Sequence, residues 1–161
     1  MERLFTPWRM AYIRNAKQDG CIFCDMLEMP DREALILHRG RLAFLVLNRY
    51  PYNNGHFMSV PYRHIDTLEL LTPDEMAEMM ALVARGLTAL RTAWQPEGFN
   101  VGVNIGGAAG AGVKGHVHMH VVPRWAGDTN FMSAVAGTRV IPQTLDETYE
   151  ELSAALRAVE T

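Results

Sequence analysis

The sequence predicts an α+β domain built around a mostly antiparallel sheet. Three observations support this fold class: five short segments with the composition of strands, an amphipathic helix between the third and fourth of them, and another amphipathic helix after the fifth. At 161 residues, of which 48% are hydrophobic and 20% charged, the chain has the size of one domain with its own core. We therefore expect a single domain over residues 1–161, without repeats or linkers.

The first three strands are expected before the long helix. Residues 34–38 and 42–47 are rich in Leu, Ile, Val and Phe and are separated by a short turn, which predicts two neighbouring strands. Residues 48–55 are rich in Asn, Tyr, Pro and Gly and predict a loop. Residues 56–61 predict the third strand. An arm over residues 1–20, with several aromatic and basic side chains, precedes these elements.

The long helix has a clear beginning and end in the sequence. Thr72 is a capping residue, a proline follows it, and Glu75 lies three residues further on, which is the pattern of a capping box. Apolar residues then recur at helical spacing to about residue 92, and Pro96 and Gly98 end the helix. Several of the ten methionines belong to this stripe. A soft-metal site would also use methionine, but this spacing favours packing in the core.

The remaining elements follow the helix. Residues 99–104 predict the fourth strand, and a segment around three alternating histidines predicts the fifth. Residues 105–114 lie between them and consist mostly of Gly and Ala. Thr144 and Glu147 begin a last amphipathic helix, within a C-terminal extension over residues 126–161.

The alternating histidines are the most informative feature of the chain. His116, His118 and His120 alternate with apolar residues, so a regular strand would place all three on one face. Binding of one metal ion by all three is unfavourable, because Cα atoms four residues apart in a strand are separated by about 13 Å. A row of solvated histidines is the other alternative, but it leaves the adjacent glycine-rich segment unexplained.

A nucleophile with supporting groups explains the histidines and the loop together. A neutral imidazole can attack phosphorus when its second nitrogen is oriented by an acceptor. Its neighbours can donate hydrogen bonds to phosphoryl oxygens, and a loop without side chains lets backbone N–H groups approach an anion. This interpretation predicts phosphoryl or nucleotidyl chemistry.

The two cysteines, Cys21 and Cys24, form one Cys-Ile-Phe-Cys segment. In a chain from a reducing compartment this spacing favours a metal site over a disulfide. A redox pair would be expected to follow a strand and open a helix, and no strand is predicted before residue 20. Two unliganded thiols are the third alternative.

The overall charge argues against some classes of partner. The formal net charge is −3 and the chain has no long basic run, which is unlike proteins that bind nucleic-acid polymers through broad electrostatic attraction. No segment approaches the roughly 20 apolar residues of a membrane span, and the first residues lack the pattern of a secretion signal. We expect a soluble cytoplasmic protein without a membrane partner.

The segment over residues 116–124 resembles the signature of the histidine-triad (HIT) superfamily of nucleotidyl hydrolases and transferases. The resemblance extends over nearly the whole chain. Further blocks around residues 2–12, 50–56 and 123–131 resemble the bacterial diadenosine-tetraphosphate phosphorylase branch more than the shorter phosphoramidase branch. It implies a HIT-like fold with a five-stranded antiparallel sheet and two main helices, and a homodimer that joins the sheets of two chains.

The resemblance also implies roles for single residues. The middle histidine of the family attacks the α-phosphorus and forms a nucleotidyl-histidine intermediate, and this position is His118. His116 and His120 complete the catalytic set, and His120 contacts the phosphoryl group. The family's nucleotide and phosphate contacts correspond to Asn48, Asn104, Gly112 and Val113.

The loop before the triad departs from the family pattern. A polar residue, often Gln or Ser, usually stands there, whereas this chain has Ala111, Gly112 and Val113. Lys114 is a candidate substitute. Trp125 and Asn130 are further candidate substrate contacts, near the distal phosphates or the second base; the alternative is that this segment packs against the sheet or a partner subunit.

Some bacterial relatives bind structural zinc, and the resemblance places the ligands at Cys21, Cys24, His64 and His116. Magnesium would accompany a polyphosphate substrate. The implied reaction converts diadenosine tetraphosphate to ADP and ATP with inorganic phosphate, or to AMP and ATP with water. Two alternatives remain: a nucleoside phosphoramidate hydrolase, and a nucleotide-binding protein with vestigial catalysis.

Overall fold

The computed structural model describes residues 20–130, 135 and 140–159. The expected N-terminal arm therefore lies outside the described residues, apart from Gly20, and so does part of the C-terminal extension. Within the described residues, no helix is sufficiently long and apolar to cross a membrane.

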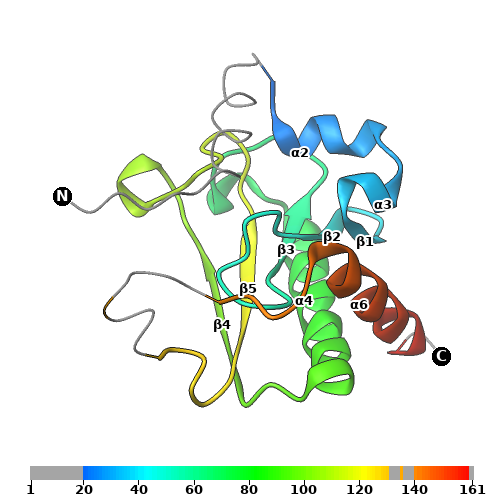
Figure 1. Ribbon diagram of the computed structural model, residues 1–161. Helices are drawn as coiled ribbons and strands as arrows, with labels where there is room; N and C mark the ends of the chain where they lie inside the picture. The colour runs from blue at the N-terminus through cyan, green and yellow to red at the C-terminus, as the bar shows by residue number, and fades with distance from the viewer. Residues whose placement is uncertain (1–19, 131–134, 136–139, 160–161) are drawn as a thin grey trace.

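A five-stranded sheet forms the centre of the molecule (Figure 1). Its strands lie in the order β1-β2-β3-β5-β4, and each neighbouring pair is antiparallel. This confirms the expected five-stranded antiparallel sheet. The strands are β1 (Ile36–Arg39), β2 (Ala43–Leu47), β3 (Phe57–Pro61), β4 (Gly98–Val103) and β5 (Met119–Arg124). Strand β5 is the last strand of the described residues but lies between β3 and β4, so the triad is next to the middle of the sheet.

Two long helices cover the sheet and each other. Helix α4 (Pro73–Trp94) packs on β2 and β3, and α6 (Leu145–Val159) packs on α4 and β1 (Figure 1). The predicted capping box is present, because Thr72 Oγ1 accepts from the Glu75 N–H while the Glu75 carboxylate accepts from the Thr72 N–H. The completely buried side chains of the core come from these strands and helices: Phe44, Leu45, Val46, Phe57, Val60, Leu90 and Leu152.

The methionines of α4 divide between two environments. Met79 is buried, as the helical stripe predicted, whereas Met76 and Met80 are 44% and 52% exposed. The prediction of core packing is therefore correct for Met79 only.

The N-terminal region contains short helices that the sequence did not predict. Helix α2 (Ile22–Asp25) carries the second cysteine, and the single-turn helix η1 (Met26–Glu28) follows it. Helix α3 (Asp31–Ala34) includes the first residue of the segment expected to form the first strand. Leu35 then adopts a left-handed conformation with φ of 62° and ends α3, so β1 begins only at Ile36.

The triad is not a regular strand along its whole length. Strand β5 begins at Met119, so His116 and His118 precede it. Val117 N–H donates to the carbonyl of Ile65 at 2.6 Å instead of joining the ladder of the sheet. The strand expected around all three histidines is therefore shorter than predicted, because it begins only after the first two, although the rings of His118 and His120 still lie with their centres 4.8 Å apart.

Two further single-turn 3-10 helices complete the described elements. Helix η2 (Leu68–Leu70) precedes α4, and helix η3 (Gly107–Ala109) lies inside the glycine-rich loop. Part of this loop therefore has a regular backbone conformation.

Candidate functional site

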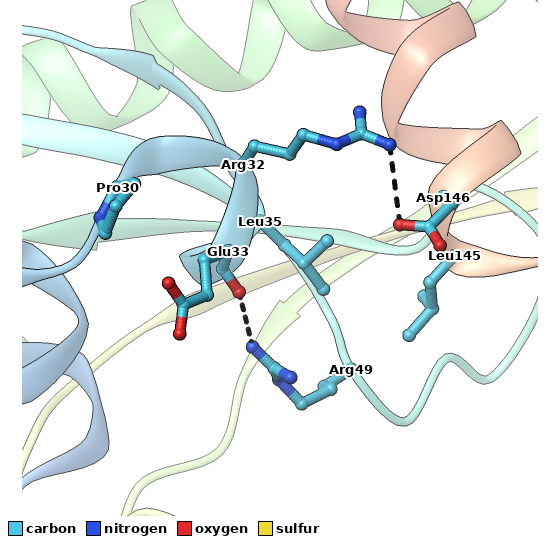
Figure 2. A pocket seen from close by; sticks show the side chains of 7 residues that line it. All are labelled: Pro30, Arg32, Glu33, Leu35, Arg49, Leu145 and Asp146. Carbon is cyan, nitrogen blue, oxygen red and sulfur yellow. Dashed lines mark hydrogen bonds and ion pairs between the residues drawn. The ribbon is translucent and has the colours of Figure 1, made fainter.

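A cavity of about 530 Å³ lies between α3 and the beginning of α6 (Figure 2). Arg32 faces Asp146 across it at 3.7 Å, and the Arg49 guanidinium donates to the carbonyl of Glu33 at 2.8 Å. None of the six histidines lines this cavity, so the chemistry of the triad is located elsewhere. The residues that line it are Pro30, Arg32, Glu33, Leu35, Arg49, Leu145 and Asp146.

His118 is held in one orientation by the backbone. Its Nδ1–H donates to the carbonyl of His116 at 2.8 Å, which leaves the lone pair on Nε2. The side chain is almost entirely buried, and the ring of Phe23 packs against it with ring centres 4.9 Å apart. An imidazole whose Nδ1–H is occupied in this way is oriented for attack through Nε2.

His120 and the buried His56 form a hydrogen-bonded pair. The backbone N–H of Tyr52 donates to Nδ1 of His56 at 3.0 Å, so a neutral His56 carries its hydrogen on Nε2. That Nε2 lies 2.9 Å from Nδ1 of His120 and donates to it. His120 must then carry its hydrogen on Nε2, where it can donate to a bound anion. The protonation pattern of both rings thus follows from one backbone N–H.

Burial favours the neutral form of His118 and His120. It lowers the pKa of His120 to about 4, with a further contribution from the neighbouring His118. Burial also lowers the pKa of His118 below its ordinary value, partly offset by the hydrogen bond to the His116 carbonyl. At neutral pH, His118 therefore has a free lone pair and His120 a single N–H, which suits a nucleophile and a hydrogen-bond donor.

The glycine-rich loop that precedes the triad in the sequence is exposed. Gly106 and Gly110 have φ values of 80° and 85°, in the left-handed region that favours glycine, and residues 106–110 are exposed. Lys114 lies along the loop, because a Cβ on Gly107 would come within 3.1 Å of its Nζ. The loop is thus accessible to an anion, with the ammonium group of Lys114 close to its backbone.

Of the other residues predicted to contact the nucleotide or the phosphate, one touches His56 directly and the rest lie on segments next to the triad in the sheet or in the chain. Asn48 is at the site, with its Nδ2 3.4 Å from both ring nitrogens of His56. Asn104 directly follows β4, whose last residue Val103 pairs with Met119 between the second and third histidines of the triad. Gly112 is exposed in the loop, whereas Val113 packs partly against the core.

Trp125 and Asn130 differ in their surroundings. The Trp125 Nε1–H donates to the carbonyl of Trp94 at 3.3 Å, and its backbone N–H donates to Asp128. These contacts place the ring at the end of α4 and favour the structural alternative for this residue. Asn130 is exposed at the end of a described segment, and its contact with substrate stays a prediction.

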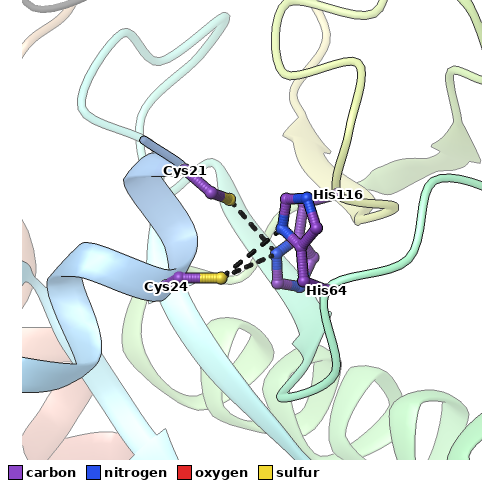
Figure 3. Close-up of side chains that lie close together, drawn as sticks. All are labelled: Cys21, Cys24, His64 and His116. Atoms are coloured by element: carbon purple, nitrogen blue, oxygen red, sulfur yellow. Dashed lines mark hydrogen bonds between the residues drawn. The ribbon is translucent and has the colours of Figure 1, made fainter. Parts of the chain in front are cut away.

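The four predicted zinc ligands come together in space (Figure 3). The ligand atoms of Cys21, Cys24, His64 and His116 all lie within 4.8 Å of one another. Sγ of Cys21 is 3.3 Å from Nδ1 of His116, and Sγ of Cys24 is 3.5 Å from Nδ1 of His64 and 3.7 Å from Nδ1 of His116. Tetrahedral zinc with ordinary bond lengths would separate sulfur and nitrogen ligands by about 3.5 Å.

The chemistry of the donor set also fits zinc. Nε2–H of His116 donates to the carbonyl of Pro61 at 2.8 Å, which leaves Nδ1 as the ligand nitrogen. Burial, together with the adjacent thiol of Cys21, raises the pKa of Cys24 to about 11 in the metal-free site. A cation between the two sulfurs would remove this penalty and deprotonate them. Two thiolates and two imidazoles form a closed structural set.

Two residues of the site were not assigned a role from the sequence. His56 is one of them; its side chain is completely buried and hydrogen-bonded to His120. Tyr52 is the other; its ring stacks on that of His120 with centres 5.8 Å apart and is tilted against the ring of His56 with centres 4.6 Å apart. The available signal in the sequence was the block over residues 50–56, which resembles the family and contains both residues.

Comparisons with known proteins agree with this geometry. The family model described as "HIT domain" matches residues 30–127. The AP-4-A phosphorylase of Mycobacterium tuberculosis (strain ATCC 25618 / H37Rv) is 44% identical over 157 residues, which cover 92% of this chain and 80% of that protein. The asymmetrical bis(5'-nucleosyl)-tetraphosphatase of Schizosaccharomyces pombe is 29% identical over 93 residues, covering 58% of this chain and 50% of the relative.

Among solved structures, a zinc-bound histidine triad family protein from Mycobacterium smegmatis is similar, with a TM-score of 0.72. It is 30% identical, and the match covers 88% of this chain and 96% of that one. The family match spans more than half of the chain, and it contains all three triad histidines and the loop before them. This chain therefore belongs to the HIT family.

Proposed function

We propose that this protein is a nucleotidyltransferase or hydrolase that cleaves dinucleoside polyphosphates through a nucleotidyl-histidine intermediate on His118. The observation that carries the proposal is the orientation of His118, whose Nδ1–H is held by the His116 carbonyl while Nε2 keeps its lone pair. The relatives named AP-4-A phosphorylase and bis(5'-nucleosyl)-tetraphosphatase support this class of substrate. The whole chain would act as one HIT domain with N- and C-terminal extensions.

In the first step, Nε2 of His118 attacks the α-phosphorus of diadenosine tetraphosphate. A P–N bond forms, the P–O bond to the leaving group breaks, and ATP departs with the electron pair on its oxygen. Nε2–H of His120 and the backbone N–H groups of the loop would stabilise the negative charge on the phosphoryl oxygens. This assigns His120 the role of hydrogen-bond donor, supported by its contact with His56.

In the second step, an oxygen of inorganic phosphate attacks the adenylyl phosphorus. The P–N bond breaks, its electron pair returns to Nε2 of His118, and ADP is formed. Water in place of phosphate would give AMP. We favour phosphate as the second substrate, because the 44% identical relative is named a phosphorylase.

The remaining predicted residues would hold the nucleotide. Asn48, beside His56, would bind the ribose hydroxyls, and Asn104 with the backbone of Gly112 and Val113 would hold the phosphate. Lys114 would neutralise charge on the leaving polyphosphate, supported by its position along the loop. Asn130 would contact the distal part of the substrate; Trp125 would serve mainly to hold the end of the triad strand in place.

Structural zinc is proposed at Cys21, Cys24, His64 and His116, whose donor atoms fit its tetrahedral geometry. Zinc would supply rigidity there and would take no part in phosphoryl transfer. His116 would then act in catalysis only through its carbonyl, which orients His118. Magnesium would enter with the polyphosphate. The two reduced cysteines suit a cytoplasmic location.

A homodimer is proposed through β4. Within the described part of the chain, β4 has β5 as its only strand neighbour and is the edge of the sheet. Val101 on this strand is 44% exposed, and an open edge with apolar side chains favours pairing with another strand. Sedimentation of wild type and a Val101→Lys variant tests this: we expect a dimer that becomes a monomer, and a monomeric wild type would contradict it.

The proposed reaction is tested by incubating the protein with diadenosine tetraphosphate, with and without phosphate, and separating the products. ADP and ATP formed only with phosphate would establish a phosphorylase. AMP and ATP in both conditions would establish a hydrolase. Absence of turnover, with fast cleavage of an adenosine phosphoramidate, would contradict the proposal. A short incubation followed by trapping of adenylyl-protein tests the covalent route. Adenylyl-protein that is lost in acid would support a P–N bond to histidine, and acid-stable adenylyl-protein would contradict it.

A further inference from the structure

The loop before β3 and the segment after β5 are joined by two buried polar residues. Asn53 Nδ2 donates to Oδ2 of Asp128 at 2.9 Å and to the carbonyl of Pro123 at 3.0 Å. Its Oδ1 accepts from the N–H of Asn54 at 3.1 Å. Asn53 is only 8% exposed, so its whole amide is used inside the protein. These contacts fix the middle of the loop to the end of the triad strand.

Asp128 is itself held firmly in place. Its carboxylate accepts from Nε of Arg124 at 2.7 Å and from a terminal nitrogen of Arg124 at 2.9 Å. The backbone N–H of Trp125 and the hydroxyl of Thr129 also donate to it. The Asp128 side chain is 10% exposed, and Arg124 holds the pKa of this carboxyl well below its usual range. Asp128 is therefore an ionised, nearly buried anchor next to Asn53.

Asn53 is bonded to the backbone of His56 and directly follows Tyr52, whose N–H contacts the ring of His56. The carbonyl of Asn53 accepts from the backbone N–H of His56 at 3.2 Å, and the preceding residue, Tyr52, donates its N–H to Nδ1 of His56. A movement of Asn53 would therefore displace the Tyr52 N–H from the ring. His56 would then be able to adopt either neutral tautomer, and Nδ1 of His120 would lose its defined donor.

We propose that Asn53 and Asp128 are positioning residues, which hold the Tyr52 N–H on His56 and thereby fix the tautomers of His56 and His120. The inference rests on the proposed function, because it gives the Nε2–H of His120 its role toward the phosphoryl group. The inference adds two residues that lie outside both the triad and the glycine-rich loop. These two residues determine whether His120 carries its hydrogen on Nε2. Asp128 and Asn53 do not contact substrate in this scheme.

The direct test measures tautomers in the free protein. With ¹⁵N-labelled histidine, long-range ¹H–¹⁵N NMR spectra of the wild type should show His56 and His120 both protonated on Nε2. In Asn53→Ala and in Asp128→Asn, we expect the two ring-nitrogen shifts of His56 to move toward each other, because both tautomers become populated. Tautomer spectra that match the wild type in both folded variants would overturn the inference.

Kinetics provide the second readout. We expect kcat to fall in both variants by up to about 100-fold, with a smaller change in KM, because the donor to the transition state is misplaced while the nucleotide contacts remain. The double variant should lose little more than either single variant, since both changes release the same loop. Additive losses, or a change in KM alone, would contradict a shared positioning role.

Glu78→Gln is the matched control. Glu78 is also a mostly buried carboxylate that holds a turn, because it accepts from the backbone N–H of Leu42 at 2.8 Å. No hydrogen bond joins it to His56 or to the triad among the described residues. This variant should keep the wild-type tautomers and kcat even if it lowers the melting temperature. If the wild type had no turnover at all, the proposed function would fail, and the NMR comparison would still decide the positioning role.

Discussion

His118 donates its Nδ1–H to the carbonyl of His116, and His116 directs its own Nδ1 toward the two cysteines. One residue thus belongs to the candidate metal site through its side chain and to the candidate nucleophile through its backbone. The ring of Phe23, from the helix that carries Cys24, packs against both imidazoles. Any displacement of the cysteine-bearing helix is therefore expected to reach His118.

Loss of the metal should reduce both stability and turnover. We expect zinc in protein purified without chelator, and we expect Cys24→Ser to lose it. Structural zinc contributes several kcal/mol of folding free energy, and each kcal/mol corresponds to about 2–4 °C in a domain of this size, so the melting temperature should fall by about 10 °C or more. Metal analysis and thermal melts measure the two effects. A chelator that removes zinc without changing either kcat or the melting temperature would contradict the coupling.

Replacement of His118 by Asn should abolish turnover and preserve binding. The Asn amide can still donate to the His116 carbonyl, but it lacks the nucleophilic nitrogen, so kcat should fall by at least about 10⁴-fold. Titration with AMP should give an affinity close to that of the wild type. His38→Asn, on β1 and outside the site, is the control and should retain activity. Residual turnover in His118→Asn above that level would exclude the covalent route through this residue.

As pH falls, kcat/KM should decrease only at pH values well below the ordinary pKa of histidine. Burial lowers the pKa of His120 to about 4, so the functional neutral form persists as pH falls through 6.5 and is lost only as pH approaches 4. We expect kcat/KM to be nearly constant between pH 6 and pH 7.5. Measurement of initial rates between pH 4 and pH 8 checks this. A loss of activity centred near pH 6.5 would contradict the expectation that both His118 and His120 are held neutral by burial.

Gly86→Ala should destabilise the protein, although alanine favours helices. In an exposed helix this change gains about 1 kcal/mol, but here the new Cβ would lie 2.3 Å from Cζ of Phe57. Overpacking of this kind lowers the free energy of unfolding by about 1–3 kcal/mol. Urea unfolding measures the change. Gly98→Ala is the control, because a Cβ there meets nothing within 4 Å. Stabilisation by Gly86→Ala would mean that Phe57 moves aside freely.

The parts of the fold that depend on local sequence could be predicted. Helix α4 begins at the residue that its capping box indicated, and the strands β2 and β3 occupy the apolar segments expected for them. These elements are determined by neighbours within a few positions of the chain. The beginning of β1 could not be predicted in this way, because the left-handed Leu35 depends on how α3 docks on the sheet.

The sequence predicted which residues form the site, but not how they contact one another. The histidines and cysteines could be assigned from their spacing and from the family resemblance. The contacts made just before β5, from the Val117 N–H to the Ile65 carbonyl and from His116 to Cys21, join residues that are far apart in sequence. The partnership of His56 with His120 joins residues 64 positions apart, and no local pattern contains that information.

The position of β5 between two earlier strands has a consequence for how the chain matures during synthesis. Until β5 arrives, β3 and β4 each have an open edge, and such edges expose a growing chain to wrong pairing. His116 emerges immediately before β5 and is the last of the four candidate zinc ligands to be made. Closure of the sheet, completion of the ligand set and orientation of His118 therefore all require the same segment of the chain, which is synthesised after the other four strands. A partly made chain has no competent centre with which to consume nucleotides.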